Sequence, residues 1–202
     1  MNVKAVIFDM GGVVVDYSNY RDYYAGYLQK ELGVDAELAQ KIVEGELLPK
    51  FYEAKIPARK FYDEVAERLG IRKEEVKWVE NFVERAKVNA KTINTIKRLK
   101  PKYATAFFSN VDNAVYVKML KLMAPYMHLF DYHFASCKLG IAKPKHAAFR
   151  LVLSKMNVKP KEAVFIDNDK NNIKGAREIG IKAILFKNNM QLDKDLRRLG
   201  LL

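Results

Sequence analysis

The stretch VKAVIFDMGGVV, residues 3–14, decides the fold of this chain. Its apolar run reaches Phe8 and ends in one carboxylate, Asp9, and a glycine pair follows two positions later. Short apolar runs that end in polar or turn residues are typical of strands buried in a sheet. Glycines after such a strand let the chain turn tightly and come close to a ligand. The stretch therefore predicts a buried first strand that carries a functional carboxylate at its carboxyl end.

Four later apolar runs have similar lengths and boundaries, and helical patterns separate them. This alternation predicts an α/β fold, a Rossmann-like parallel sheet with helices on both faces. The predicted strands are residues 3–9, 103–110, 132–136, 162–168 and 182–188, and the predicted helices between the last four are 113–130, 145–157 and 171–180.

The first gap is far longer than a crossover connection needs, at about 90 residues, and its apolar residues have helical spacing. We therefore predict two parts, a core domain of residues 1–16 and 89–202 and a helical cap domain of residues 17–88. Four helices are expected in the cap, around Tyr20–Leu32, Leu38–Val43, Phe61–Leu69 and Val76–Ala86, with Gly33, Pro49, Pro57 and Gly70 between them.

Composition limits the classes of function. The 202 residues contain one cysteine, Cys137, which excludes an internal disulfide, and no apolar run approaches the ~20 residues that span a bilayer. With no signal-peptide pattern, a cytoplasmic location without a membrane partner is expected. The net charge of +12 suits an anionic substrate, whereas a nucleic-acid partner would rest on charge alone, because the lysines are spread along the chain.

Polar residues gather where the predicted strands end. Asp9 ends the first strand, Ser109 and Asn110 end the second, Asp167 and Asn168 end the fourth, and a loop after the third carries Lys143. Ligands of parallel α/β sheets bind at this edge, and this mixture of groups can hold a cation and a phosphate together. By themselves, Ser109 and Asn110 would also suit the cap of the next helix.

These segments make the chain resemble the haloacid dehalogenase-like (HAD) hydrolase superfamily over essentially its whole length. FDMGGVV (8–14), FFSN (107–110), LGIAKPK (139–145) and FIDNDKNNIKGAREIGI (165–181) look like its four motifs in order. The helical insert stands where the superfamily carries its helical cap. The first motif is similar to a branch with a D-x-G-G-V opening.

The resemblance implies a Mg²⁺-dependent phosphatase of small phosphorylated metabolites. It assigns Asp9 as the nucleophile that forms an aspartyl-phosphate, with Lys143 neutralising the charge of both anions. The resemblance also implies substrate-binding and metal-binding groups. The implied substrate-binding residues are Ser109, Asn110 and Gly12, and the implied Mg²⁺ ligands are Asp9, the carbonyl of Gly11, Asp167 and Asn168.

Two positions depart from the superfamily's pattern. Gly11 stands where its phosphatases carry a second aspartate as general acid and base, and Asn168 stands where the fourth motif often has a second aspartate. General acid–base catalysis is typically worth about 10²–10⁴-fold, so we expect activity that is weak or restricted to good leaving groups.

Two alternatives stay open at this point. The absence of an aspartate at positions 11 and 168 also fits a catalytically silent phosphate-binding or partner-binding module. A haloacid dehalogenase also lacks the second aspartate and needs no metal. However, this sequence has Gly11 where dehalogenases carry an aromatic residue and Phe149 where they carry a tyrosine. The sequence determines neither the substrate nor the oligomeric state.

Overall fold

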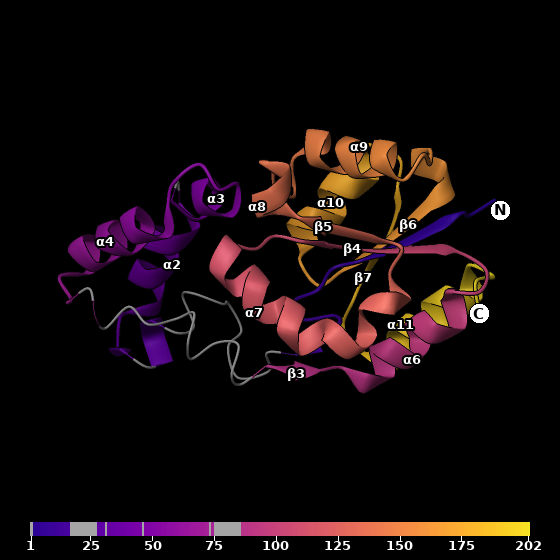
Figure 1. Ribbon diagram of the computed structural model, residues 1–202, viewed down its shortest axis with the longest axis horizontal. Coiled ribbons are helices and arrows are strands. Elements are labelled where there is room, and N and C mark those ends of the chain that lie inside the picture. Colours follow the sequence, from indigo (N-terminus) through magenta and orange to yellow (C-terminus); the bar gives the residue numbers. More distant parts are fainter. Residues whose placement is uncertain (1, 17–27, 31, 46, 73, 75–85) are drawn as a thin grey trace.

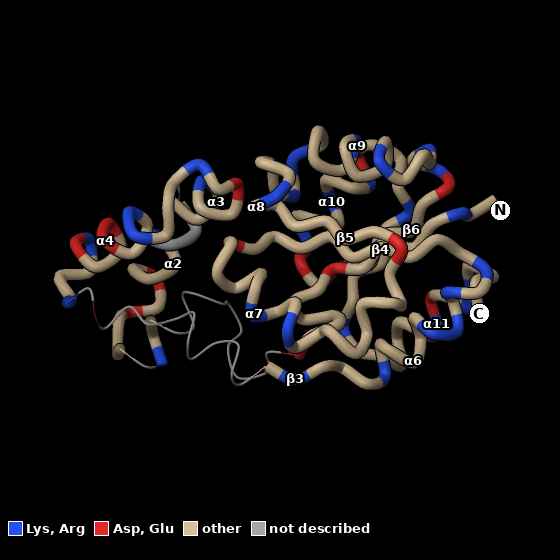
Figure 2. The backbone as a smooth tube through the Cα atoms, in the orientation of Figure 1, with Lys and Arg blue, Asp and Glu red and all other residues tan. Residues whose placement is uncertain are grey.

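The computed structural model describes residues 2–16, 28–30, 32–45, 47–72, 74 and 86–202. Figure 1 shows a sheet between two layers of helices, with further helices beyond one end of the strands. In the described part of the chain, no helix is both long and apolar enough to cross a membrane. Figure 2 shows Lys and Arg positions on the helices of every layer.

The central sheet has five parallel strands in the order β5-β4-β1-β6-β7. They are β1 (Ala5–Phe8), β4 (Ala104–Ser109), β5 (Tyr132–Ala135), β6 (Ala163–Asp167) and β7 (Lys182–Leu185). All five predicted strands are confirmed. β1 lies in the middle, and its last residue, Phe8, is in register with Phe107 of β4 and Ile166 of β6. This register brings the carboxyl ends of the three strands to one edge.

Successive side chains of the strands point to opposite faces, and each face has its own apolar core. Val6 and Phe8 face one layer, whereas Ile7 faces the other. The first layer consists of α6 (Ala90–Leu99), α7 (Asn113–Met123), the 3₁₀ helix η2 (Ala124–Leu129) and α11 (Asn189–Arg198), and the second of α9 (His146–Lys155) and α10 (Lys170–Glu178).

Three described helices follow β1 in the insert. They are α2 (Ala36–Glu44), α3 (Leu47–Tyr52) and α4 (Ala58–Leu69). The rings of Phe51 and Phe61 stack with centroids 4.1 Å apart and pack α3 against α4. Gly70 ends α4 in the left-handed conformation that favours glycine. The predicted division into core and cap domains remains a prediction, although these helices lie within its cap segment.

The insert differs from its prediction at Pro49, which lies in the first turn of α3 rather than between helices. Helix N–H groups have no partner there, so a residue without an N–H is tolerated. Leu28 and Leu32 of the predicted first helix are helical. The tyrosines of that helix, and residues 76–85 of the predicted fourth helix, lie outside the described residues, and Ala86 is not helical.

A two-stranded antiparallel ribbon joins the segments where the chain leaves and re-enters the core. It consists of β2 (Val15–Asp16) and β3 (Lys87–Val88). Directly after it, Asn89 caps α6 by accepting the Thr92 N–H, and its amide donates to the Val13 carbonyl at 3.2 Å. Asn89 therefore fixes the return of the chain against the loop that follows β1.

Candidate active site

Four predicted site residues lie at the carboxyl edge of the sheet. Asp9 directly follows β1, Ser109 is the last residue of β4, and Asp167 is the last residue of β6. Lys143 comes from the loop between α8 (Ser136–Leu139) and α9. All four are buried, with at most 7% of any residue exposed. The parallel register of the strands therefore brings Asp9, Ser109 and Asp167 to one edge, and the loop before α9 adds Lys143.

The ammonium of Lys143 is the centre of this site. Its Nζ donates to Asp9 Oδ1 at 2.7 Å, to Asp167 Oδ2 at 2.8 Å and to the Phe108 carbonyl at 2.8 Å. An ammonium has three N–H donors, so these acceptors use all of them. The rings of Phe108 and Phe165 lie 5.2 and 5.3 Å from Nζ and add a favourable contact for the cation.

The charges of the site are unbalanced, since two carboxylates surround one ammonium. Burial raises the pKa of Asp9 to about 7. The nearby Lys143 ammonium lowers this pKa, but by less than burial raises it, and the Asp167 carboxylate raises it further. Burial also lowers the pKa of Lys143, but the two carboxylates outweigh this, and that pKa is raised overall. A second cation near Asp9 and Asp167 would therefore be attracted electrostatically.

Asp167 is held rigidly by its neighbours. Its Oδ1 accepts the Asp169 N–H at 2.7 Å, and its Oδ2 accepts Asn172 Nδ2 at 3.1 Å. Asn172 was not among the predicted site residues, although its place five residues after the strand-end carboxylate Asp167 was a usable signal. The side chain of Asp169 caps α10 by accepting the N–H of Asn171 at 2.6 Å, so this carboxylate supports the helix.

Asn110 holds the backbone of Lys143 from the core side. Its Oδ1 accepts the Lys143 N–H at 2.9 Å, and its Nδ2 donates to the Lys143 carbonyl at 2.8 Å. The cap of α7 is Asp112, so the alternative that Ser109 and Asn110 cap this helix was wrong. Contact of Asn110 with substrate stays a prediction, and the two-bond clamp is an additional role that the sequence did not indicate.

The glycine pair after Asp9 allows a compact turn. The N–H groups of Val14 and Val15 both donate to the Met10 carbonyl, and Gly12 has a φ of +76°. A Cβ atom on Gly12 would come within 2.4 Å of Asn168 Nδ2. The Asn168 amide therefore lies directly over Gly12, so a predicted metal ligand and a predicted substrate-binding residue are neighbours. Both roles remain predictions.

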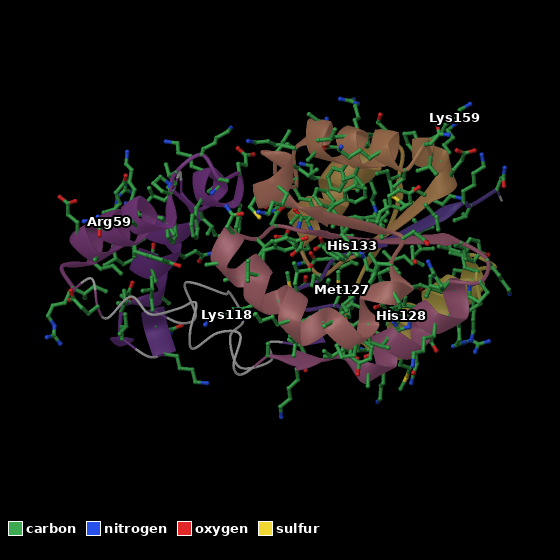
Figure 3. All side chains as sticks on the ribbon, viewed as in Figure 1. Arg59, Lys118, Met127, His128, His133 and Lys159 are labelled. Atoms are coloured by element: carbon green, nitrogen blue, oxygen red, sulfur yellow. The ribbon has the colours of Figure 1, made fainter. Side chains whose placement is uncertain are left out.

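The histidines do not gather with these residues. His146 Nε2 lies 2.7 Å from Glu178 Oε2 on α10. Figure 3 labels His128 on η2 and His133 on β5, and the ring of His133 stacks on Phe107 with centroids 5.1 Å apart. Among the described residues, no three His, Cys, Asp or Glu side chains form a metal-binding group. A metal here would rest on two carboxylates, a backbone carbonyl and an amide.

Comparison with known proteins identifies the family. A model of the haloacid dehalogenase-like hydrolases matches residues 3–180. The chain belongs to this family.

Among curated relatives, bifunctional epoxide hydrolase 2 of Sus scrofa is 27% identical over 98% of this chain. The matched region is only 38% of the length of that relative. Two relatives of similar length are the sesquiterpene phosphatase astK of Aspergillus oryzae and the D-ribitol-5-phosphate phosphatase of Bacteroides thetaiotaomicron. Each is 24% identical to this chain. The alignment with astK covers 97% of this chain and 96% of that protein, and the alignment with the ribitol-phosphate phosphatase covers 96% and 97%.

Solved structures confirm the HAD fold. A HAD family enzyme of Bacteroides thetaiotaomicron superposes with a TM-score of 0.75 at 21% identity, covering 93% of this chain and 95% of the other. The same enzyme in complex with magnesium and inorganic phosphate gives a TM-score of 0.72 at 22% identity, covering 92% and 94%. A HAD-like hydrolase of Porphyromonas gingivalis gives 0.75 at 20% identity, with 98% of both chains covered.

Proposed function

We propose that this HAD hydrolase is a Mg²⁺-dependent phosphatase of small phosphorylated metabolites. The observation that carries the proposal is the buried Lys143 ammonium, which contacts both Asp9 and Asp167. A cationic group between two carboxylates suits a reaction in which an anionic nucleophile must approach an anionic phosphate. The phosphatases among the relatives, and the family enzyme solved with magnesium and phosphate, support the same choice.

The donor set of the site fits Mg²⁺. This ion prefers oxygen ligands and is usually held by one or two carboxylates together with substrate phosphate oxygens. Asp9 and Asp167 supply the carboxylates, and the Gly11 carbonyl and the Asn168 amide are the further candidates. Bound there, Mg²⁺ would supply positive charge that polarises the phosphoryl group and lets Asp9 ionise.

Two displacements at phosphorus make up the proposed reaction. A carboxylate oxygen of Asp9 attacks phosphorus, the bond from phosphorus to the leaving oxygen breaks, and an aspartyl-phosphate forms. A water molecule then attacks the same phosphorus, and the bond to Asp9 breaks. Inorganic phosphate leaves, and the carboxylate is regenerated. Lys143 neutralises charge in both steps, and the Ser109 hydroxyl donates to a phosphoryl oxygen in the proposed reaction.

The assay that tests this function measures phosphate release from a metabolite panel with Mg²⁺ or with EDTA. Turnover that needs Mg²⁺ is expected. Dehalogenation of 2-haloacids that persists in EDTA would instead identify a dehalogenase. No Mg²⁺ binding and no turnover on any panel member would identify a silent binding module.

Gly11 predicts a strong dependence on the leaving group. Without a side chain there to donate a proton, acyl, aryl and anomeric phosphates should react fastest, because they leave as weaker bases than alkoxides. We expect log(kcat/KM) to fall steeply as the leaving-group pKa rises across a substrate series, provided that chemistry limits the rate.

A flat dependence would show that another group supplies the proton. Asp16 is the first described candidate, because it is exposed on β2 near the glycine turn. His146 is less suitable, since its ring pairs with Glu178. The third candidate, Tyr17, lies outside the described residues. Gly11→Asp is the complementary variant, and if its carboxylate reaches the leaving oxygen it should flatten the slope.

A further inference from the structure

The loop that carries Lys143 is held on three sides. Asn110 binds the backbone of Lys143 from the core, as described above. From α10, Gly175 lets the helix approach so closely that a Cβ atom there would lie 2.4 Å from the Pro144 carbonyl oxygen. The third contact comes from the insert. Glu53 is the residue directly after α3, and its side chain reaches the loop.

Glu53 binds the loop at two points. Its Oε1 accepts the Ala142 N–H at 3.2 Å and also pairs with Lys145 Nζ. These partners stand one residue before and two residues after Lys143. α3 also contacts α8, directly before this loop, and Figure 1 shows the two helices next to each other. The carboxylate of Glu53 therefore spans the segment from which Lys143 points into the site.

This carboxylate is buried, with only 2% of its side chain exposed, whereas the Lys145 side chain is 50% exposed. A buried charge is costly unless ionic and hydrogen-bonding partners satisfy it. Lys55 Nζ completes the set at 2.7 Å from Oε2. Burial raises the pKa of Glu53, but hydrogen bonds from Lys145, Lys55 and Ala142 outweigh this effect and leave that pKa below its usual value.

We propose that Glu53 is a positioning residue that fixes the Lys143 loop from the insert and so couples the placement of α3 to the phosphoryl site. This role rests on the proposed function, because Glu53 acts through Lys143. Errors of about 1 Å in the placement of a reacting group can reduce turnover by about 10²-fold. A loop tied only by Asn110 and α10 would hold the ammonium less accurately between Asp9 and Asp167.

The test compares Glu53→Ala and Glu53→Gln with Glu64→Ala. Glu64 lies on α4, where it pairs with Lys60 and Arg68, so its variant is a matched loss of a carboxylate in the insert. Steady-state kinetics with p-nitrophenyl phosphate and Mg²⁺ should show kcat about 10-fold lower or more for Glu53→Ala, a larger effect than the rise in KM that weaker phosphate binding causes. Glu53→Gln keeps an acceptor for the Ala142 N–H and should retain intermediate turnover. Glu64→Ala should match the wild type.

Hydrogen–deuterium exchange supplies a readout that does not depend on turnover. Exchange in the segment 139–146 should be faster in Glu53→Ala than in Glu64→Ala, while exchange in β6 should be unchanged in both. Inorganic phosphate, titrated calorimetrically with Mg²⁺ present, should bind at least about threefold more weakly to Glu53→Ala. Circular dichroism establishes that each variant is folded. If Glu53→Ala does not fold, Glu53→Gln takes its place in the comparison with Glu64→Ala.

The outcomes separate the two proposals. Unchanged exchange in 139–146 would overturn the positioning role, and so would faster exchange with unchanged kcat, or equal losses in Glu53→Gln and Glu53→Ala. If the wild type hydrolyses no phosphate ester, the proposed function fails. Exchange and phosphate affinity then decide the role of Glu53 by themselves, since both shift if it positions the loop and neither shifts if it does not.

Discussion

Asp9→Asn is expected to reduce turnover by about 10³-fold or more while leaving the fold intact. Asparagine has the size of aspartate but lacks the nucleophilic carboxylate that attacks phosphorus. The fold should tolerate the change, because burial already raises the pKa of Asp9 to about 7 and so disfavours its charge. Lys143 keeps its contact with Asp167 at 2.8 Å. The measurements are kcat/KM on the best panel substrate and the midpoint of thermal unfolding.

Asp193→Asn is the matched control for this experiment. Asp193 lies on α11, outside the four motifs, where it accepts a hydrogen bond from Thr95 and pairs with Arg98 at 3.4 Å. Its variant should retain wild-type turnover. Full activity in Asp9→Asn would rule out an aspartyl-phosphate on this residue, whatever the behaviour of the control.

The sheet could be predicted from the sequence because its strands are buried on both faces. Such strands appear as short apolar runs, and each of the five runs forms a strand. The strand order was not predictable in the same way, because pairing depends on contacts between distant segments. The β2–β3 ribbon was missed for a related reason, since two-residue strands leave no periodic pattern.

Two helices of the core were also missed, although the sequence contains signals for both. α6 begins after the capping residue Asn89 and carries Ile93 and Ile96 at helical spacing. Its threonines have low helix propensity and weaken the pattern. α11 begins after Asn188 in a polar segment that resembles a loop, and only Leu192 and Leu196 mark its buried face. Packing against the sheet decides both helices.

At the site, the sequence predicted which residues stand at the strand ends but not how they are held. The parallel register is sufficient to bring Asp9 and Asp167 together, and the third motif indicated that Lys143 joins them. The supporting contacts of Asn110, Asn172 and Glu53 depend on side-chain directions that periodicity does not encode. Glu53 is the extreme case, because it lies 89 residues before its partner Ala142 in the chain.

Lys143→Ala is expected to lower turnover by about 10²–10³-fold, and at least as strongly as Ser109→Ala. Loss of one preorganised group that stabilises transition-state charge typically costs this much. The serine offers one hydrogen bond among several donors, whereas the lysine reduces the repulsion between the nucleophile and the phosphate. The measurement is kcat for both variants with saturating Mg²⁺ and the same substrate.

The same variant should also be less stable, by about 3–5 kcal/mol in metal-free buffer, because it leaves two buried carboxylates without their counter-ion. Without Lys143, the folded-state pKa of Asp9 should rise above its present value of about 7, while in the unfolded chain it is close to 3.8. The wild type and the variant both lose stability as the pH rises from about 3.8 to about 7, and above about 7 only the variant, whose Asp9 is still protonated in the folded state, continues to lose it. The deficit in the unfolding midpoint should therefore be larger at pH 8 than at pH 5.

Lys60→Ala gives the matched control, because Lys60 is exposed on α4 and lies 3.8 Å from its partner Glu64. An exposed ion pair contributes little, so this variant should keep both its turnover and its unfolding midpoint. If Lys143→Ala were as harmless as Lys60→Ala, the loop would not reach the reacting phosphate, and the third motif would be assigned wrongly. A deficit in stability without a loss of turnover would make Lys143 a structural counter-ion of Asp9 and Asp167, and the charge needed for phosphoryl transfer would then have to come from Mg²⁺ alone.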